Sequence, residues 1–131
     1  MSKRTKARET LMQLVFQMEA RNSSDEELTT PVLEEKGTDK KQEEYIKENF
    51  KAIADNLGEI DALIEANSLK WKLSRIPKTD LAIMRVAIGE SKYGTGTPAE
   101  VAINEAVELA KEYCGEKSPS FINGVLGKAL S

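Results

Sequence analysis

Residues 98–130 read PAEVAINEAVELAKEYCGEKSPSFINGVLGKAL and predict two helices with distinct start signals. Thr97, Pro98 and Glu100 combine an N-cap threonine, a first-turn proline and a glutamate three residues on, the pattern of a capping box. Ser118 and Pro119 repeat the cap-plus-proline start for the second helix. The polar side chains of the first helix share an arc of about 120°. They are Asn104, Glu105, Glu108, Lys111 and Glu112. We therefore expect this helix to be central and packed on more than one side.

The composition is that of a globular protein of one domain, or of two small halves that share a core. Of 131 residues, 40% are hydrophobic and 31% are charged, as expected for a soluble chain. No apolar run approaches the roughly 20 residues of a membrane span, and the N-terminus has no apolar signal region. The single cysteine, Cys114, rules out an internal disulfide. We expect a cytoplasmic protein that does not associate with membranes.

The chain contains no histidine. This absence removes the usual general base, the usual proton shuttle and the commonest metal ligand. Carboxylates and lysines could still serve in catalysis, but the composition argues against an enzyme. We expect no catalytic residues, no metal and no cofactor.

Charge is unevenly distributed along the chain, although the net charge is only -3. Residues 1–22 hold five basic and two acidic side chains, residues 23–66 hold five and thirteen, and residues 67–131 hold nine and seven. One hypothesis is a cationic face that binds an anion and an acidic face that repels it. Ordinary solvated faces would give the same counts.

The first predicted helix covers residues 4–21 and has an apolar stripe with helical spacing. The stripe consists of Ala7, Leu11, Leu14, Val15 and Met18. Four cations precede or begin it, namely Lys3, Arg4, Lys6 and Arg8, although cations oppose the macrodipole at a helix N-terminus. Either an anionic ligand offsets this cost or the terminus is solvated. Phe16 lies off the stripe, and it either packs against a second body of the protein or is an exposed aromatic.

Three further helices are predicted in the first half. Ser24–Glu27 forms a capping box for a short helix that Gly37 ends, and Asp39 with Gln42 starts the next. The buried stripes of the third and fourth helices are separated by Gly58. These stripes are Ile46, Phe50, Ile53 and Leu57, followed by Ile60, Leu63 and Ile64. Residues 67–77 are the expected hinge, with Trp71 filling the junction between the halves.

The stretch LAIMRVAI, residues 81–88, is too apolar for a helix that lies on the surface. At helical pitch a narrow polar strip remains, formed by Lys78, Arg85, Gly89 and Lys92. The strip is either a solvated edge or a cationic lining for an anion, and Arg85 could instead hold an internal carboxylate such as Glu105. The pattern as a whole predicts an all-α fold of about seven helices. We expect two small bundles, residues 1–66 and 67–131, within a single domain of residues 1–131.

Several motifs occur in order along the whole chain, and the two most specific are AINEAVELAK (102–111) and FINGVL (121–126). The others, in chain order, are Arg8-Glu9, Ile60-Asp61 with Leu63-Ile64, Trp71, Leu73 with Arg75-Ile76, Asp80 with Ile83-Met84-Arg85, and Pro98. Together these motifs resemble those of the bacterial NusB family of transcription antitermination factors. The resemblance implies two perpendicular helical bundles. It also implies a non-enzymatic factor that binds single-stranded boxA RNA together with NusE, a ribosomal small-subunit protein. That factor would act in the RNA polymerase antitermination complex on ribosomal RNA operons, in the bacterial cytoplasm.

The resemblance also implies roles for particular residues. RNA contacts are expected from Lys3, Arg4, Lys6, Arg8, Phe16, Lys117 and Phe121, and a partner contact from Asp80. Thr5 interrupts what is often an unbroken arginine run in the family, Lys117 stands where some members are acidic, and Gly89 replaces a residue that is commonly aromatic in the family. The alternative function is a protein-interaction module, or a homodimer that masks the RNA-binding face. We expect a third reading, as the N-terminal domain of an RNA methyltransferase, to fail because residues up to Ser131 hold no cofactor-binding region.

Overall fold

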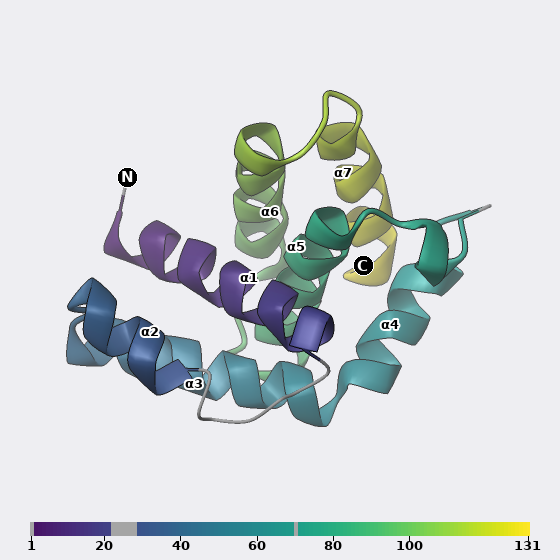
Figure 1. The fold of residues 1–131 in the computed structure, drawn as a ribbon. Coiled ribbons are helices and arrows are strands. Elements are labelled where there is room, and N and C mark those ends of the chain that lie inside the picture. The colour runs from purple at the N-terminus through teal and green to yellow at the C-terminus, as the bar shows by residue number, and fades with distance from the viewer. Residues whose placement is uncertain (1, 22–28, 70) are drawn as a thin grey trace.

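The computed structural model describes residues 2–21, 29–69 and 71–131, and its regular secondary structure in these ranges is helical (Figure 1). It has seven α-helices in the described residues and no strand there. They are α1 (Lys3–Arg21), α2 (Thr29–Lys36), α3 (Lys40–Asp55), α4 (Leu57–Ala66), α5 (Lys78–Ile88), α6 (Ala99–Tyr113) and α7 (Ser118–Ala129). A 3-10 turn, Leu73–Arg75, precedes α5, and a π-helical segment, Gly89–Tyr93, continues it. The prediction of an all-α fold is confirmed.

The centre of the molecule is α5. Every residue from Asp80 to Glu90 is buried, and α5 packs against α1, α4, α6 and α7. This confirms the prediction for residues 81–88, since a helix that is apolar nearly all round must be enclosed. The prediction that α6 is the central helix is wrong. It does pack on more than one side, against α5 and α7, but Val101 and Tyr113 are exposed on a side that no other described helix covers.

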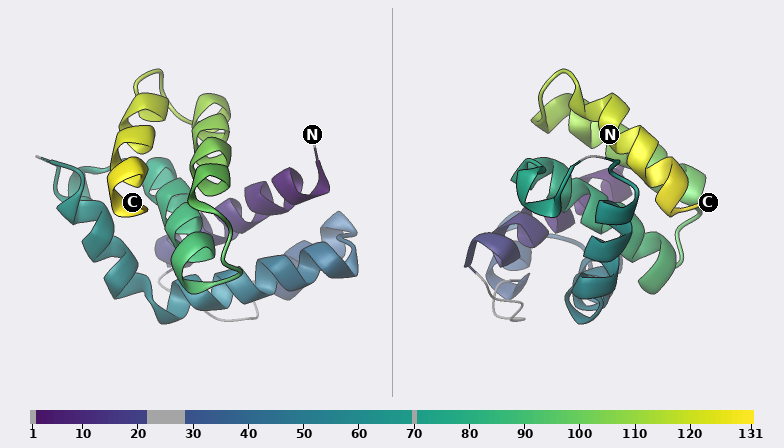
Figure 2. Two further views of the ribbon diagram at one scale, coloured as in Figure 1. Left: turned by 180° about the vertical axis from the view of Figure 1, so that it is seen from behind. Right: turned by 90° about the vertical axis from the view of Figure 1, so that its right-hand side faces the viewer.

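One hydrophobic core extends through all seven helices. Figures 1 and 2 show α1 and α3 running across the direction of α6 and α7, with α5 between the two layers. Although α4 belongs to the first half of the chain, it packs against α5 and α7. The division into bundles at residues 66 and 67 therefore stays a prediction. None of the helices described is both long and apolar enough to span a membrane.

The predicted stripe of α1 is confirmed, because Ala7, Leu11, Leu14, Val15 and Met18 are all buried. Ser2 begins the helix, where its hydroxyl accepts a hydrogen bond of 3.0 Å from the backbone N–H of Thr5. Phe16 is 39% exposed, so of the two interpretations of this ring the exposed one is correct.

The predicted helix starts were partly right. Asp39 accepts the N–H of Gln42 at 3.0 Å and begins α3, as expected. The caps expected at Thr97 and Ser118 are absent, because α6 begins at Ala99 without a side-chain cap and Ser118 lies inside the first turn of α7.

The predicted breaks between helices were also partly right. Gly37, at φ +61°, ends α2 as expected, while the start expected at residues 24–27 lies outside the described residues. Gly58 does not end a helix, because the break falls at Asn56, which closes α3 and precedes α4.

Trp71 does not fill the junction between the halves. Its side chain is 53% exposed and follows Leu69, which is 83% exposed. The contacts of α4 with α5 and α7 already close this region of the core, so the loop after α4 can project its apolar side chains outward. The expectation for Trp71 was therefore wrong.

Candidate nucleic-acid interface

The cations at the start of α1 have different surroundings. The side chain of Lys3 is 80% exposed, and its Nζ lies 3.2 Å from the carboxylate of Asp39. Lys6 is exposed and has no ion pair among the described residues. The guanidinium carbon of Arg4 lies 4.0 Å from the ring centroid of Tyr45, a cation–π distance. Lys3, Arg4 and Lys6 thus present positive charge at one end of the molecule.

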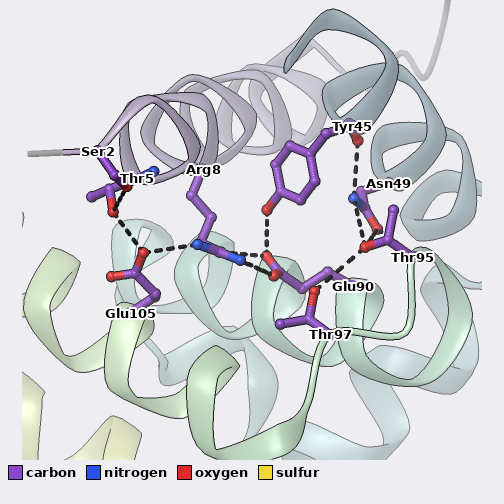
Figure 3. A network of polar contacts seen from close by, with 9 residues as sticks. All are labelled: Ser2, Thr5, Arg8, Tyr45, Asn49, Glu90, Thr95, Thr97 and Glu105. Carbon is purple, nitrogen blue, oxygen red and sulfur yellow. Dashed lines mark hydrogen bonds and ion pairs between the residues drawn. The ribbon is translucent and has the colours of Figure 1, made fainter. Parts of the chain in front are cut away.

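Arg8 faces the interior, with 5% of its surface exposed (Figure 3). Its Nε and Nη2 donate to Glu90 at 2.9 and 2.7 Å, and its Nη1 donates to Glu105 at 2.8 Å. Burial works against the charge, but the hydrogen bonds and charge of Glu90 raise the pKa of Arg8. The prediction that Arg8 contacts RNA is not supported, because its donors are used by two carboxylates of the protein.

Glu90 is the centre of a buried network that connects four elements (Figure 3). It is fully buried on the π-helical segment and accepts hydrogen bonds from Arg8 of α1 and from the hydroxyl of Tyr45 of α3, the latter at 2.6 Å. Burial, followed by the charge of Glu90, raises the pKa of Tyr45, which keeps the phenol a donor. Thr5 donates to Glu105 of α6 at 2.7 Å. The network therefore fixes α1 against α3 and α6.

A second set of hydrogen bonds holds the loop that follows the π-helical segment. Asn49 of α3 donates to the carbonyl of Tyr45 at 2.9 Å and accepts the backbone N–H of Thr95 at 3.1 Å. The carbonyl of Glu90 accepts backbone N–H groups of residues 96 and 97. Sequence reasoning missed Glu90, Tyr45 and Asn49 as structural residues. A signal was present, because Glu90 is a carboxylate only two positions after the apolar stretch of residues 81–88.

Of the strip expected along α5, Arg85 and Gly89 are buried, whereas Lys78 and Lys92 are exposed, so the strip does not form a continuous cationic lining. Arg85 is buried and donates from Nε and Nη2 to Asp61 of α4, both at 2.8 Å, and from Nη1 to Glu19 of α1 at 3.0 Å. Lys78 also pairs with Glu19, at 3.2 Å. The interpretation that Arg85 pairs with carboxylates of the protein itself is confirmed. The expected partner was wrong, since Glu105 pairs with Arg8.

The two site residues predicted near the start of α7 have different surroundings. Lys117 is exposed just before α7. Phe121 is half-buried and lines a largely apolar groove with Leu69, Trp71 and Lys128, so it faces the loop after α4. The structure therefore defines two surfaces, one on α1 and one at this groove.

Asp80 lies inside the molecule. It is buried in the first turn of α5, beside the half-buried thiol of Cys114 in the loop after α6. Burial, together with the hydrogen bond and charge of Asp80, raises the pKa of Cys114 to about 12. This position does not support a direct contact between Asp80 and a partner.

Exposed cations and an exposed aromatic ring occur together on α1. Such a surface suits a polyanion with aromatic bases, since lysines attract the backbone and a ring can stack on a base. Among residues 2–21, 29–69 and 71–131, no cluster of three His, Cys, Asp or Glu side chains is placed to hold a metal ion. Fold and surface together define a small all-helical protein with a cationic first helix.

Comparison with known proteins identifies the family. Residues 5–131 match the NusB family. The transcription antitermination protein NusB of Acetivibrio thermocellus is 49% identical over 127 residues, covering 97% of this chain and 88% of that protein. The chain therefore belongs to the NusB family of transcription antitermination proteins.

Solved structures share the fold. T. maritima NusB is 36% identical with a TM-score of 0.83, covering 96% of this chain and 89% of that one. A crystal structure of the antitermination factors NusB and NusE in complex with dsRNA contains a chain that is 27% identical, with a TM-score of 0.87. The match covers 98% of this chain and 96% of that one.

Proposed function

We propose that this chain is an RNA-binding antitermination factor that acts with NusE on boxA in nascent RNA and supports transcription of ribosomal RNA operons. The observation that carries the proposal is the exposure of Lys3, Lys6 and Phe16 on one helix that a buried network holds in place. The solved complex of a similar NusB chain with NusE and dsRNA supports it. The protein would then work in the bacterial cytoplasm, within the RNA polymerase antitermination complex.

We expect two kinds of contact with RNA, ionic contacts to phosphates and stacking on a base. Lys3, Arg4 and Lys6 contact phosphates, and Lys117 adds a further cation at the edge of the surface. Phe16 stacks on an unpaired base, an interaction that contributes about 1–3 kcal/mol. Arg8 and Glu90 position α1 and make no contact with RNA, because their polar groups are buried and paired with each other.

NusE would bind at the groove between α7 and the loop after α4. Leu69 and Trp71 are large, apolar and mostly exposed there, and Phe121 and Val125 continue the same apolar surface. Exposed apolar patches of this kind mark protein interaction sites. The family partner is a protein, whereas RNA requires cations, of which the groove has only Lys128 among its described lining residues. This assignment replaces Asp80, which is buried, as the partner contact, and it moves Phe121 from the expected RNA contacts to the proposed partner surface.

A binding titration tests the RNA function. Single-stranded boxA-like RNA, scrambled RNA and duplex RNA are titrated with the protein, with and without NusE, at several salt concentrations. We expect preference for boxA-like single strands, increased affinity with NusE, and a slope of log affinity against log salt near about -2 if three cations neutralise phosphates. A stable dimer that binds no RNA, even with NusE, would instead support the homodimer that masks this face.

Phe16→Ala tests the stacking contact. We expect the affinity for boxA-like RNA to fall by about 1–3 kcal/mol with little change in thermal stability, since the ring is exposed. Trp71→Ala is the matched aromatic control. It should leave binding of RNA alone unchanged and weaken the effect of NusE. If Phe16→Ala lowers the thermal stability and leaves the RNA affinity unchanged, the ring packs against the protein and does not stack on a base.

A further inference from the structure

Arg4 differs from the two lysines near it on α1, because an aromatic ring holds its side chain. Arg4 is half-buried, and its guanidinium carbon lies 4.0 Å from the ring centroid of Tyr45. Lys3 and Lys6 are exposed, and of these two only Lys3 has an ion pair in the described part of the chain, with Asp39. A guanidinium that stacks on a ring is restricted in its conformation, whereas an exposed lysine samples many rotamers.

The ring that holds Arg4 is itself fixed from below (Figure 3). Tyr45 is 2% exposed, and its hydroxyl donates to Oε2 of Glu90 at 2.6 Å. Glu90 is fully buried and is held in turn by Nε and Nη2 of Arg8. Arg4 and Arg8 are four positions apart and therefore share the face of α1 that meets this ring. The ring cannot move away from α1 without breaking a buried hydrogen bond.

The stack on Tyr45 leaves the N–H groups of Arg4 unused. Arg4 donates no hydrogen bond and makes no ion pair to any group in the described part of the chain. Arg8 and Arg85, by contrast, donate to internal carboxylates. A guanidinium carries its donors in a planar fork that matches two oxygens of one phosphate. Arg4 thus combines a restricted position with donors that are available to a ligand.

We propose that Tyr45 is a positioning residue for RNA binding, whose ring holds Arg4 where its guanidinium binds one phosphate through two hydrogen bonds. A side chain that is already ordered avoids the loss of freedom that binding otherwise imposes. The inference rests on the proposed RNA-binding function and adds to it a buried residue of α3 that acts through Arg4. It also gives Arg8 an indirect part in binding, since Arg8 holds the carboxylate of Glu90 to which the ring is attached.

Two substitutions of Tyr45 separate the ring from its hydroxyl. Tyr45→Leu removes the ring and should weaken the affinity for single-stranded boxA-like RNA by about two- to tenfold, the cost of ordering one long side chain. Tyr45→Phe is the conservative variant. It keeps the ring and should restore the affinity to within about twofold of the wild type, although it loses the hydrogen bond to Glu90 and some stability. Affinities are measured with NusE present, and circular dichroism measures the folded fraction of each variant.

A double-mutant cycle separates positioning of Arg4 from a general loosening of α1. Arg4→Gln should weaken binding and reduce the salt slope by about 0.7. If Tyr45 acts through Arg4, adding Tyr45→Leu to Arg4→Gln should cause no further loss of RNA affinity. Lys6→Gln is the matched control, because Lys6 is exposed and lies on another side of the helix. Adding Tyr45→Leu to Lys6→Gln should still weaken binding by about two- to tenfold.

A fluorinated phenylalanine incorporated at position 45 tests the same contact without a cavity, and it decides the question if Tyr45→Leu does not fold. Fluorine weakens the negative face of the ring, which attracts the guanidinium, and leaves the shape of the ring nearly unchanged. We expect this protein to bind RNA about two- to fivefold more weakly than Tyr45→Phe does.

Two kinds of result would overturn the inference, and they can be told apart. If removing or fluorinating the ring leaves the RNA affinity equal to that of Tyr45→Phe, or if Tyr45→Leu weakens binding equally with and without Arg4, the ring does not position Arg4 although RNA binding stands. If the wild-type protein binds no RNA, the proposed function fails and this inference fails with it.

Discussion

Arg8 and Lys6 lie two positions apart on α1 but serve different purposes. Lys6 is exposed and unpaired among the described residues, whereas Arg8 is enclosed by Glu90, Glu105 and the ring of Tyr45. Helical geometry explains the difference, because two positions rotate a side chain by about 200° around the axis. The cationic cluster thus consists of exposed residues, which we propose contact RNA, and of Arg8, which holds the fold.

Arg8→Met should destabilise the protein strongly. Removing the guanidinium leaves the fully buried carboxylate of Glu90 without its cation, and breaking a buried ion pair costs about 3–5 kcal/mol. Urea unfolding measures the loss. Lys6→Met is the matched control and should change the stability by less than about 0.5 kcal/mol while weakening RNA binding. If Arg8→Met leaves the stability unchanged but loses RNA affinity, Arg8 contacts the RNA and does not hold the fold.

The thiol of Cys114 should stay protonated well above neutral pH. Its pKa in the folded protein is raised to about 12, so the folded state holds the proton more tightly than the unfolded chain does. This contribution to stability is present below about pH 9 and is lost as the pH rises from 9 through 12. We expect stability to fall over that window, and Cys114→Ser to make the fall shallower.

Alkylation by iodoacetamide gives an independent measurement of this thiol, because the thiolate is the reactive form. The native protein should react slowly at pH 8, and Asp80→Asn should react faster, since the carboxylate of Asp80 helps to raise the pKa. A native rate equal to that of the unfolded chain would contradict this account.

At the scale of the element, the π-helical segment after α5 determines how closely α3 can approach. Gly89 is buried there, and a Cβ at this position would overlap the side chain of Ile53. The same segment carries Glu90, so the contact between Gly89 and Ile53 also places Glu90 beside Tyr45. The glycine at position 89 thus lets Ile53 fill the space beside it.

Gly89→Ala should destabilise the protein by about 1–3 kcal/mol, the usual cost of overpacking a core. Gly58→Ala is the matched control, because Gly58 lies in α4 and has open space around its Cα. Alanine there should stabilise the protein by about 0.5–1 kcal/mol through helix propensity. Thermal unfolding measures the change in stability of both variants. Equal changes in the two would show that Ile53 of α3 leaves room for a side chain at position 89.

At the scale of the whole molecule, the two halves share α5 as a common centre. It packs against α1 and α4 from the first half and against α6 and α7 from the second. The ion pairs of Arg85 with Glu19 and Asp61 cross between the halves in the same way. The proposed surfaces for RNA and for NusE therefore lie on one continuous core.

Neither half should fold alone. Residues 67–131 would expose the face of α5 that α1 covers, and residues 1–66 would lose the helix on which α1 and α4 pack. We expect the separate fragments to show no cooperative thermal transition by circular dichroism, and the mixture to recover one. Cooperative unfolding of either fragment by itself would show that the predicted bundles are independent units.

The sequence predicted the features that depend on neighbours along the chain. The all-α class, the stripe of α1, the enclosed stretch 81–88, the Asp39 cap and the end of α2 at Gly37 all follow from local periodicity or local hydrogen bonds. The exposed lysines of the candidate site were among these features as well. Two exceptions were the caps at Thr97 and Ser118. A cap at Thr97 predicts a helix that begins at Pro98, but α6 begins one residue later, at Ala99. Ser118, the predicted cap of α7, is instead the first residue of that helix.

Only the tertiary structure decided which charged groups are internal. By itself the sequence determined that Arg8, Arg85 and Glu90 are charged and that Trp71 is large and apolar. It did not determine that Arg8 pairs with Glu90 across 82 positions, that Arg85 chooses Asp61 and Glu19 over Glu105, or that Trp71 faces outward. The physical reason is that helical periodicity is a property of a short segment. The pairing of a buried charge depends instead on which distant carboxylate the packing of several helices brings within hydrogen-bond distance.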